Sequence, residues 1–247
     1  RELAVPCYLL GNGSNILFGD KGYAGAVISL AGMKGEARRE GDTLTAPAGM
    51  PLNALCMAAL HAGLTGLEFA YGIPGTVGGA VYMNAGAYGG EMKDVLLSVR
   101  YLTAEGQIEE APAAALDLGY RHSIFESNGG CILSAAVGLA PGDPGAIAAR
   151  MNDLMGRRRD KQPLDKPSAG STFKRPVGAF AGALIEQCGL RGHRHGGAAI
   201  SEKHCGFVVN LGGATCADVL ALCSEVQQIV KEQTGFVLEK EIRVVEL

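Results

Sequence analysis

Short apolar runs separated by glycine-containing turns dominate the first fifty residues. Runs of strand length lie at residues 7–10, 16–18 and 26–30, and a further pair at 36–40 and 43–46 flanks Gly41-Asp42. Apolar runs of this length, bounded by turn residues, are typical of strands. The pattern therefore predicts a sheet with glycine-rich connections in this part of the chain.

Apolar residues at helical spacing predict four helices, the first of which begins at Pro51. The first helix has Leu52, Leu55, Cys56 and Ala59 on one face, and Gly63 follows it. Proline at the start and glycine just past the end are typical of helix termini. The other three are a helix that begins at Asp143-Pro144 and ends in Arg157–Arg159, a short one at 180–188, and a long amphipathic one between Thr215 and Gly235.

The long fourth helix carries the strongest local signal. Thr215 and Asp218 have the spacing of a capping box, in which each side chain accepts a hydrogen bond from the backbone of the other residue. Its inward face is predicted from apolar residues at helical spacing, namely Val219, Leu222, Cys223, Val226, Ile229 and Val230.

Several strands are predicted later in the chain. Residues 95–102 and 107–110 flank Ala104-Glu105-Gly106, which indicates a hairpin. Residues 207–210 form an apolar run, and 236–247 alternate as a last strand. The polar stretch 159–167 contains two prolines and is the predicted domain boundary.

Composition and charge exclude several function classes. The 247 residues carry 22 Lys and Arg against 25 Asp and Glu, a net charge of -3, so no basic field is present to hold nucleic acid or an anionic membrane. No apolar run approaches the roughly 18 residues of a membrane helix, and no signal peptide precedes the first strand. We expect a cytoplasmic protein whose sequence upstream of Arg1 is missing.

The seven cysteines are odd in number, scattered and free of any C-x-x-C pair, which indicates a reducing compartment and buried, inert thiols. His193, His195, His204 and Cys205 do not have the spacing of a metal site, so no metal is expected. Ser171 has no His–Asp partner identifiable in the sequence, so acyl transfer is not indicated.

A small-residue turn follows the first predicted strand. Backbone N–H groups in Gly11-Asn12-Gly13-Ser14-Asn15 are able to converge on a phosphate, but a turn with two glycines of positive φ explains the same residues equally well. A dinucleotide-binding G-x-G-x-x-G is excluded because Ile16 stands where the third glycine belongs and no helix is predicted next.

The 37 glycines, about twice the usual share, concentrate at residues 72–80 and 84–90. The run 72–80 is too glycine-rich for an ordinary helix. Backbone packed closely against a large flat or polyphosphate ligand explains it better than a structural loop does. We therefore predict a nucleotide-type cofactor. Taken alone, the polar segments 120–123, 168–175 and 239–243 are typical of solvated surface, with Glu239, Glu241 and Arg243 on one face of the last strand.

Six motifs in this order resemble the UDP-N-acetylenolpyruvoylglucosamine reductase (MurB) family, in its shorter subtype. They lie at residues 11–15, 72–79, 83–89, 120–125, 167–176 and 241–243. The resemblance implies an α+β flavoprotein of peptidoglycan precursor synthesis. Its two-subdomain FAD-binding fold of the vanillyl-alcohol-oxidase/PCMH type would cover 1–158, with subdomains about 1–62 and 63–158. A small α/β substrate-binding domain would cover 159–247. Family members carry a further segment before Cys7, so the FAD-binding domain is expected to be incomplete.

The resemblance further implies two cofactors, FAD and NADPH, the latter as hydride donor. The residues that it assigns to cofactor binding are Gly11, Asn12, Gly13, Ser14, Asn15, Gly72, Ile73, Pro74, Gly75, Thr76, Gly78, Gly79, Ala80, Asn84, Gly86 and Arg243.

For the reaction, the resemblance implies transfer of a hydride to C3 of the enolpyruvyl group of UDP-N-acetylglucosamine enolpyruvate, which yields UDP-N-acetylmuramate. Arg121 and Glu241 match the residues that polarise its carboxylate, and Ser171 matches the residue that protonates C2. Substrate binding is expected from Tyr120, Lys174, Arg175, Lys203 and His204.

Two alternatives remain at this point, an FAD-dependent oxidase of the same superfamily and a flavin-less UDP-sugar-binding fragment. Rapid oxygen consumption would indicate the oxidase, and failure to retain flavin would indicate the fragment. In each case the partners are small molecules, and we expect a monomer.

Overall fold

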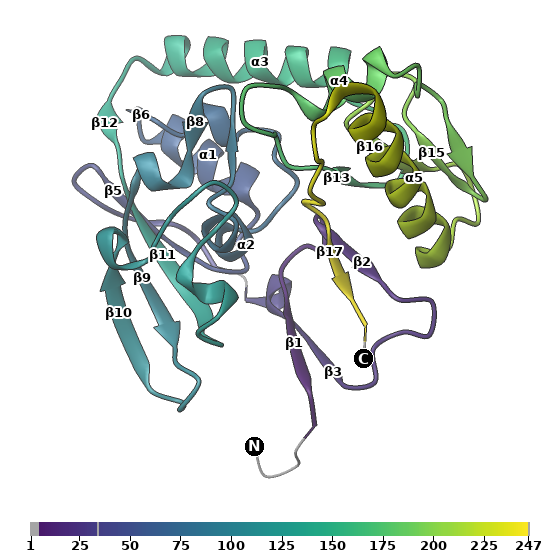
Figure 1. The fold of residues 1–247 in the computed structure, drawn as a ribbon. Helices are drawn as coiled ribbons and strands as arrows, with labels where there is room; N and C mark the ends of the chain where they lie inside the picture. The colour runs from purple at the N-terminus through teal and green to yellow at the C-terminus, as the bar shows by residue number, and fades with distance from the viewer. Residues whose placement is uncertain (1–4, 34, 247) are drawn as a thin grey trace. The chain divides into compact units, whose positions relative to one another are not determined.

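The computed structural model describes residues 5–33 and 35–246. The chain divides into two compact units. Of the described residues, the N-terminal unit comprises 7–12, 27–33 and 35–158, and the C-terminal unit comprises 5–6, 13–26 and 159–246. In Figure 1 the first unit runs from purple to teal, and the second contains the green and yellow elements with part of the purple segment.

A five-stranded antiparallel sheet forms the body of the N-terminal unit. Its order is β10 (Ile108–Pro112), β9 (Leu96–Leu102), β11 (Cys131–Gly138), β5 (Thr43–Pro47) and β4 (Arg38–Glu40). The predicted hairpin is confirmed, because β9 and β10 pair in antiparallel register from Ile108 opposite Leu102. Four short pairing strands, β6 (Leu64–Thr65), β12 (Ala140–Pro141), β7 (Gly86–Ala87) and β8 (Gly90–Glu91), complete the unit with β1 (Cys7–Leu10) and β3 (Ala26–Ser29).

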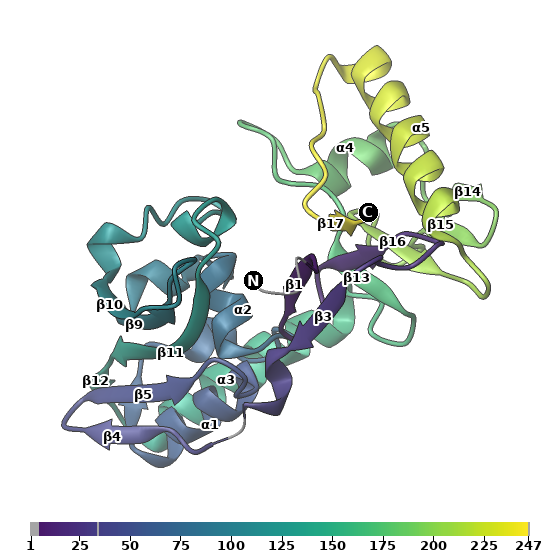
Figure 2. The same ribbon diagram turned by 90° about the horizontal axis from the view of Figure 1, so that it is seen from below.

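Helix α1 (Leu52–His61) buries the face predicted from its spacing, including Leu52, Leu55 and Ala59. Figure 2 shows α1 beside strands β4 and β5 of the same unit. Helix α3 (Pro144–Lys161) begins where Asp143 Oδ1 accepts a hydrogen bond from the Ala146 backbone at 2.8 Å. It runs two residues beyond its predicted end at Arg159, and the two units divide between Arg158 and Arg159.

Helix α2 (Val77–Tyr82) corrects the expectation that residues 72–80 are too rich in glycine for a helix. The Thr76 hydroxyl caps it by accepting a hydrogen bond from Gly79 N at 3.3 Å. A Cβ on Gly78 would lie 2.8 Å from the Ala48 Cβ, so this glycine lets the helix pack directly on its neighbour. Burial thus outweighs the low helix propensity of glycine.

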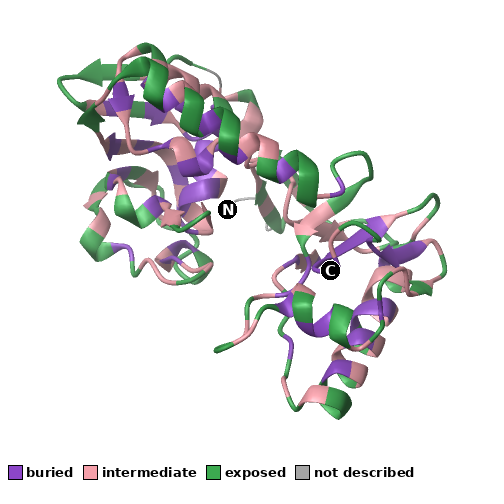
Figure 3. Cartoon of the chain, turned by 90° about the horizontal axis from the view of Figure 1, so that it is seen from above, coloured by how far each residue is buried: buried purple, intermediate pink, exposed green. Residues whose placement is uncertain are grey.

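A four-stranded antiparallel sheet, β13 (Ser168–Ser171), β16 (Phe207–Asn210), β15 (Ala198–Ile200) and β14 (Arg194–His195), forms the body of the C-terminal unit. Helices α4 (Ala181–Gln187) and α5 (Cys216–Thr234) belong to the same unit. The predicted capping box of α5 is confirmed, and Gly235 ends the helix with φ 76°. Figure 3 shows that buried and exposed positions alternate along α5, as expected of an amphipathic helix.

The prediction of one strand over 236–247 is wrong in extent. Only β17 (Arg243–Val245) is a strand, and it pairs in parallel with β2 (Ile16–Phe18). Upstream of it, Lys240 forms a single antiparallel bridge with Phe173. The segment therefore pairs with Phe173 before Glu241 and with β2 after it, so no continuous β-ladder spans the described residues 236–246. Within the described residues, no helix is both long and apolar enough to cross a membrane.

Candidate active site

A cavity of about 480 Å³ opens in the N-terminal unit, a volume within the usual range of ligand sites. Five of the predicted cofactor-binding residues line it, namely Asn12, Ile73, Pro74, Gly75 and Thr76. None of its described lining residues carries a charge. The cavity therefore presents backbone and amide groups to a ligand.

Sequence reasoning missed the other wall of this cavity. Gly49, Met50, Pro51, Asn53 and Ala54 line it from the loop before α1 and the first turn of the helix. Backbone hydrogen bonds join the two walls, from Leu52 N to Gly75 O and from Val77 N to Met50 O, both at 2.9 Å. The signal available in the sequence was Gly49-Met50-Pro51 immediately before a helix.

The predicted glycine turn lies against the same segment. A Cβ on Gly11 would come within 2.7 Å of Thr76 Oγ1, so close packing requires glycine there. Asn12 Nδ2 donates a hydrogen bond to Pro74 O at 3.1 Å. Gly13 has φ 69° and β2 begins at Ile16, so no helix follows the turn, as predicted. Gly78, Gly79 and Ala80, by contrast, lie in α2 and do not line the described cavity.

Arg121 occupies a strained turn in the same unit. Gly119 and His122 exchange two backbone hydrogen bonds of 3.2 Å, and Arg121 is the second of the two residues between them. Its φ of 56° is one that such a turn usually gives to glycine or asparagine. Arg121 Nη2 donates to Gly86 O at 3.1 Å, and the guanidinium lies 5.0 Å from the Tyr120 ring. Strain of this kind persists only where neighbouring contacts impose it, and it is frequent at functional sites.

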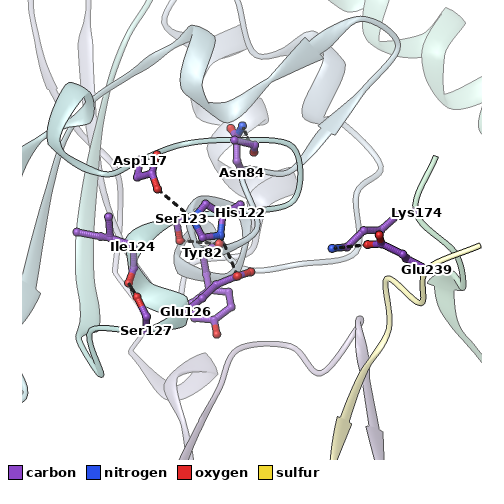
Figure 4. A network of polar contacts seen from close by, with 11 residues as sticks. Tyr82, Asn84, Asp117, His122, Ser123, Ile124, Glu126, Ser127, Lys174 and Glu239 are labelled. Carbon is purple, nitrogen blue, oxygen red and sulfur yellow. Dashed lines mark hydrogen bonds and ion pairs between the residues drawn. The ribbon is translucent and has the colours of Figure 1, made fainter. Parts of the chain in front are cut away.

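Asn84 supplies contacts that hold Arg121 in this strained conformation. This side chain is fully buried and has φ 39°. Its Nδ2 donates to Glu91 Oε2 at 2.7 Å and to Gly119 O at 2.9 Å, and its Oδ1 accepts from Lys93 N at 2.8 Å. The predicted cofactor residue thus anchors one end of the Arg121 turn, and Figure 4 shows it close to the helix that carries Tyr82.

His122 holds the other end of the turn. Its Nδ1 lies 2.9 Å from Glu126 Oε2 and its Nε2 lies 3.2 Å from Asp117 Oδ2 (Figure 4). The hydrogen bond to Glu126, helped by Asp117, raises the pKa of His122 above its ordinary value. Next to it, Ser123 Oγ donates to Tyr82 O at 2.7 Å. The sequence alone does not single out Asp117 or Glu126, because no local motif relates them to His122.

Ser171 and Glu241 belong to the C-terminal unit and are held by backbone bonds. Ser171 ends β13 and is exposed. The next residue, Thr172, is 1% exposed, and its carbonyl accepts a hydrogen bond from Glu241 N at 2.8 Å. Asn15 reaches the same segment, since its Nδ2 donates to Glu241 O at 3.2 Å and its carbonyl accepts from Arg243 N at 3.0 Å. The structure therefore brings the segments of Ser171, Glu241, Arg243 and Asn15 together.

The predicted substrate-binding residues of this unit have intramolecular contacts. Lys174 Nζ lies 3.5 Å from Glu239 Oε2, a pair of exposed groups drawn in Figure 4, and the Arg175 guanidinium lies 4.5 Å from the Phe180 ring. Lys203 Nζ donates to Arg159 O at 2.5 Å. His204 Nδ1 accepts from Gly206 N at 3.0 Å, and burial lowers its pKa. Lys203 and His204 are thus already engaged within the protein.

His193 Nε2 and His195 Nδ1 contact the two oxygens of Glu225, at 2.9 and 2.7 Å. The His193 contact, then that of His195, lowers the pKa of Glu225. In the described part of the chain no group of three or more His, Cys, Asp or Glu is placed to hold a metal ion.

Comparison with known proteins decides the family. The chain is 50% identical over 245 residues to the UDP-N-acetylenolpyruvoylglucosamine reductase of Lachnoclostridium phytofermentans. This match covers 98% of this chain and 79% of that relative. The chain is 49% identical to the enzyme of the same name from Agathobacter rectalis, over 98% of this chain and 81% of the relative. The chain belongs to the UDP-N-acetylenolpyruvoylglucosamine reductase family.

Two family models match different parts of this reductase-family chain. Residues 1–111 match the FAD binding domain, and residues 162–245 match the C-terminal domain of UDP-N-acetylenolpyruvoylglucosamine reductase. The crystal structure of the reductase (MurB) from Thermus caldophilus superposes with a TM-score of 0.84 at 38% identity, over 98% of this chain and 86% of that one. The resemblance and the fold class inferred from the sequence are confirmed. The lining of the 480 Å³ cavity lies entirely within the FAD-binding match.

Proposed function

We propose that this chain catalyses the NADPH-dependent, FAD-mediated reduction of UDP-N-acetylglucosamine enolpyruvate to UDP-N-acetylmuramate, a step of peptidoglycan precursor synthesis. The observation that carries the proposal is an uncharged 480 Å³ cavity in the FAD-binding segment of a chain half identical to named reductases. The domain division at 158/159 is part of the proposal, with FAD binding before it and substrate binding after it.

The cavity residues suit FAD. Small residues and proline line most of it, so a flat ring system is able to approach the backbone, and Asn12 and Asn53 contribute amide groups. Asn53 Oδ1 accepts from Gly72 N at 2.6 Å, which ties the two walls together. The chemistry that bound FAD supplies is transfer of a hydride from NADPH to C3 of the enolpyruvyl group.

Arg121 and Glu241 are proposed to polarise the substrate carboxylate. Hydride addition at C3 builds negative charge at C2 and on the adjacent carboxylate, and fixed donors stabilise that charge most when they need no rearrangement. The turn that carries Arg121 is tied through Asn84 and His122 and therefore meets this condition. Glu241 is proposed to contribute a hydrogen bond to the same carboxylate.

Ser171 is proposed to deliver its Oγ proton to C2. Its side chain is exposed at the end of β13, and its backbone is held in the sheet, which gives the hydroxyl a defined place. A serine hydroxyl needs positive charge nearby to act as an acid, and we propose Lys174 and Arg175 as its source. Tyr120, Lys203 and His204 complete the proposed substrate contacts.

We infer that the enzyme acts in the cytoplasm as a monomer on small-molecule substrates. Two measurements test the function. Titration of the chain with FAD is expected to saturate near one flavin per chain, and the holoenzyme is then expected to oxidise more than one NADPH per flavin only when the enolpyruvyl substrate is present. Rapid NADPH-independent oxygen consumption would indicate an oxidase instead, and absence of flavin binding would indicate a flavin-less binding fragment.

A further inference from the structure

Strand β13 contains an irregularity immediately before Ser171. Ser168 pairs with Val209 and Ser171 pairs with Phe207, so β13 has one residue more than β16 between these pairs. Gly170, within the irregular stretch, has φ 79°. This is a β-bulge, a feature that bends a strand and re-aims the side chains beside it, often next to active sites. The register at which β13 pairs with β16 after the bulge therefore determines the position of Ser171.

Pairing resumes at Ser171, and the next residue, Thr172, fixes it there. Its N–H donates to Gly206 O at 2.8 Å, and its Oγ1 accepts from Val208 N, also at 2.8 Å. Val208 lies opposite the bulge, between the two paired residues of β16. The threonine hydroxyl thus adds a side-chain acceptor for the Val208 N–H opposite the bulge.

The opposite edge of Thr172 holds the last segment of the chain. Its carbonyl accepts from Glu241 N at 2.8 Å, and two residues further Lys174 N donates to Glu239 O at 2.8 Å. Thr172 is therefore bonded to both neighbours of β13, and it is itself 1% exposed. A residue this buried is held by its contacts and does not reach solvent.

We propose that Thr172 is a positioning residue for the substrate half of the reaction. Its hydroxyl sets the register at which β13 resumes after the bulge, and its peptide group holds the Glu241 backbone, so that Ser171 Oγ and the Glu241 carboxyl keep one relative placement. The proposal rests on the proposed function, in which those two groups act on the substrate. Thr172 itself contacts neither substrate nor cofactor.

Thr172→Val tests the proposal, because valine preserves the shape and both backbone bonds of Thr172 but removes its side-chain acceptor for Val208 N. In stopped-flow measurements on the FAD-loaded protein, we expect reoxidation of the flavin by the enolpyruvyl substrate to slow by at least about tenfold, as small misplacements of reacting groups do. Reduction by NADPH is expected to be unchanged. Thr172→Ser retains the hydroxyl and is expected to restore reoxidation to within a factor of about two.

Thr234→Val is the matched control. It removes a hydroxyl of the same unit, one that donates to Val230 O at 2.6 Å at the end of α5. Both half-reactions are expected to stay at the parent rate. A purely structural effect would slow the two half-reactions of Thr172→Val together, or would leave Thr172→Ser as slow as Thr172→Val, and either result overturns the proposal.

Ser171→Ala separates this proposal from the proposed function. If Ser171→Ala reoxidises at the parent rate, the assigned role of Ser171 is wrong. If Ser171→Ala is slow while Thr172→Val is not, only the positioning role is wrong. Thr172→Ala replaces Thr172→Val should the valine variant not fold, and failure of both to fold with FAD would show that the hydroxyl is structural and overturn the proposal.

Discussion

The two units hold their proposed catalytic residues by different kinds of contact. In the N-terminal unit, Arg121 sits at φ 56° in a turn tied by the side chains of Asn84 and His122. In the C-terminal unit, Ser171 ends a strand held by backbone bonds and by one side chain, Thr172. Strained backbone needs several independent side-chain contacts, whereas sheet pairing supplies most of its own. Loss of single side chains should therefore affect the two units differently.

The largest expected effect is that of Ser171→Ala, which removes a reacting group without disturbing the sheet that holds it. Flavin reoxidation by substrate should slow by roughly 10²–10⁴-fold, the usual contribution of a positioned proton donor. Reduction by NADPH should keep its rate. Stopped-flow absorbance of the flavin measures both, and an equal slowing of the two half-reactions would refute the proton-donor role.

Asn84→Ala breaks the side-chain network at its buried centre. It leaves the Lys93 N–H without its acceptor, removes one of the two donors to the Gly119 carbonyl and keeps a non-glycine residue at φ 39°. The free energy of unfolding should fall by about 2–3 kcal/mol. Urea denaturation measures it. Asn128→Ala, which removes the single hydrogen bond that the exposed Asn128 side chain accepts from Gly130 N in the same unit, should cost under about 1 kcal/mol. Similar losses in the two variants would contradict the network role.

Arg121→Lys keeps the charge of the strained turn but loses the planar fork. Lysine does not reproduce both the hydrogen bond to Gly86 O and a two-point contact to a carboxylate. We expect kcat/KM for the enolpyruvyl substrate to fall by roughly ten- to thirtyfold. Steady-state kinetics test this expectation, and Arg100→Lys, at an exposed position of β9, is the control. Parent-like kinetics for Arg121→Lys would show that Arg121 has no part in the mechanism.

The smallest expected effect is on the pH dependence of stability. Glu126 and Asp117 raise the pKa of His122 above 6.5, so protonated His122 stabilises the folded state below that pH. The contribution is lost as the pH rises through the raised pKa. His122→Gln should therefore flatten the fall in stability above about pH 6.5, as measured by urea denaturation across pH. Glu126→Gln should flatten it as well, and unchanged slopes in both would exclude this linkage.

Local residue patterns were sufficient for the hairpin and for the helices α1, α3, α4 and α5. The capping box Thr215–Asp218, the terminating Gly235 and the turn at residues 103–107 depend on neighbours in the chain, and the structure has each of them. The family motifs were also recognisable in the sequence, because each glycine-rich motif consists of consecutive residues. The cavity lined by residues 73–76 lies within that segment.

The roles of individual polar residues were not visible in the same way. Asn84 belongs to a glycine-rich motif, yet its amide reaches Gly119, and Asp117 and Glu126 gather around His122 only through the fold. Lys203 and His204, predicted to contact substrate, also have partners within the protein. Side-chain contacts between residues far apart in sequence have no local signature.

The sequence by itself determined four of the helices, the hairpin, the place of the glycine-rich motifs and which family the chain resembles, because capping, turn and glycine chemistry act over a few residues. Only the tertiary structure decided that Val77–Tyr82 is helical despite its glycines, that the last segment leaves Phe173 to pair with β2, and that Thr172 ties Ser171 to Glu241. These outcomes depend on burial and on partners distant in sequence.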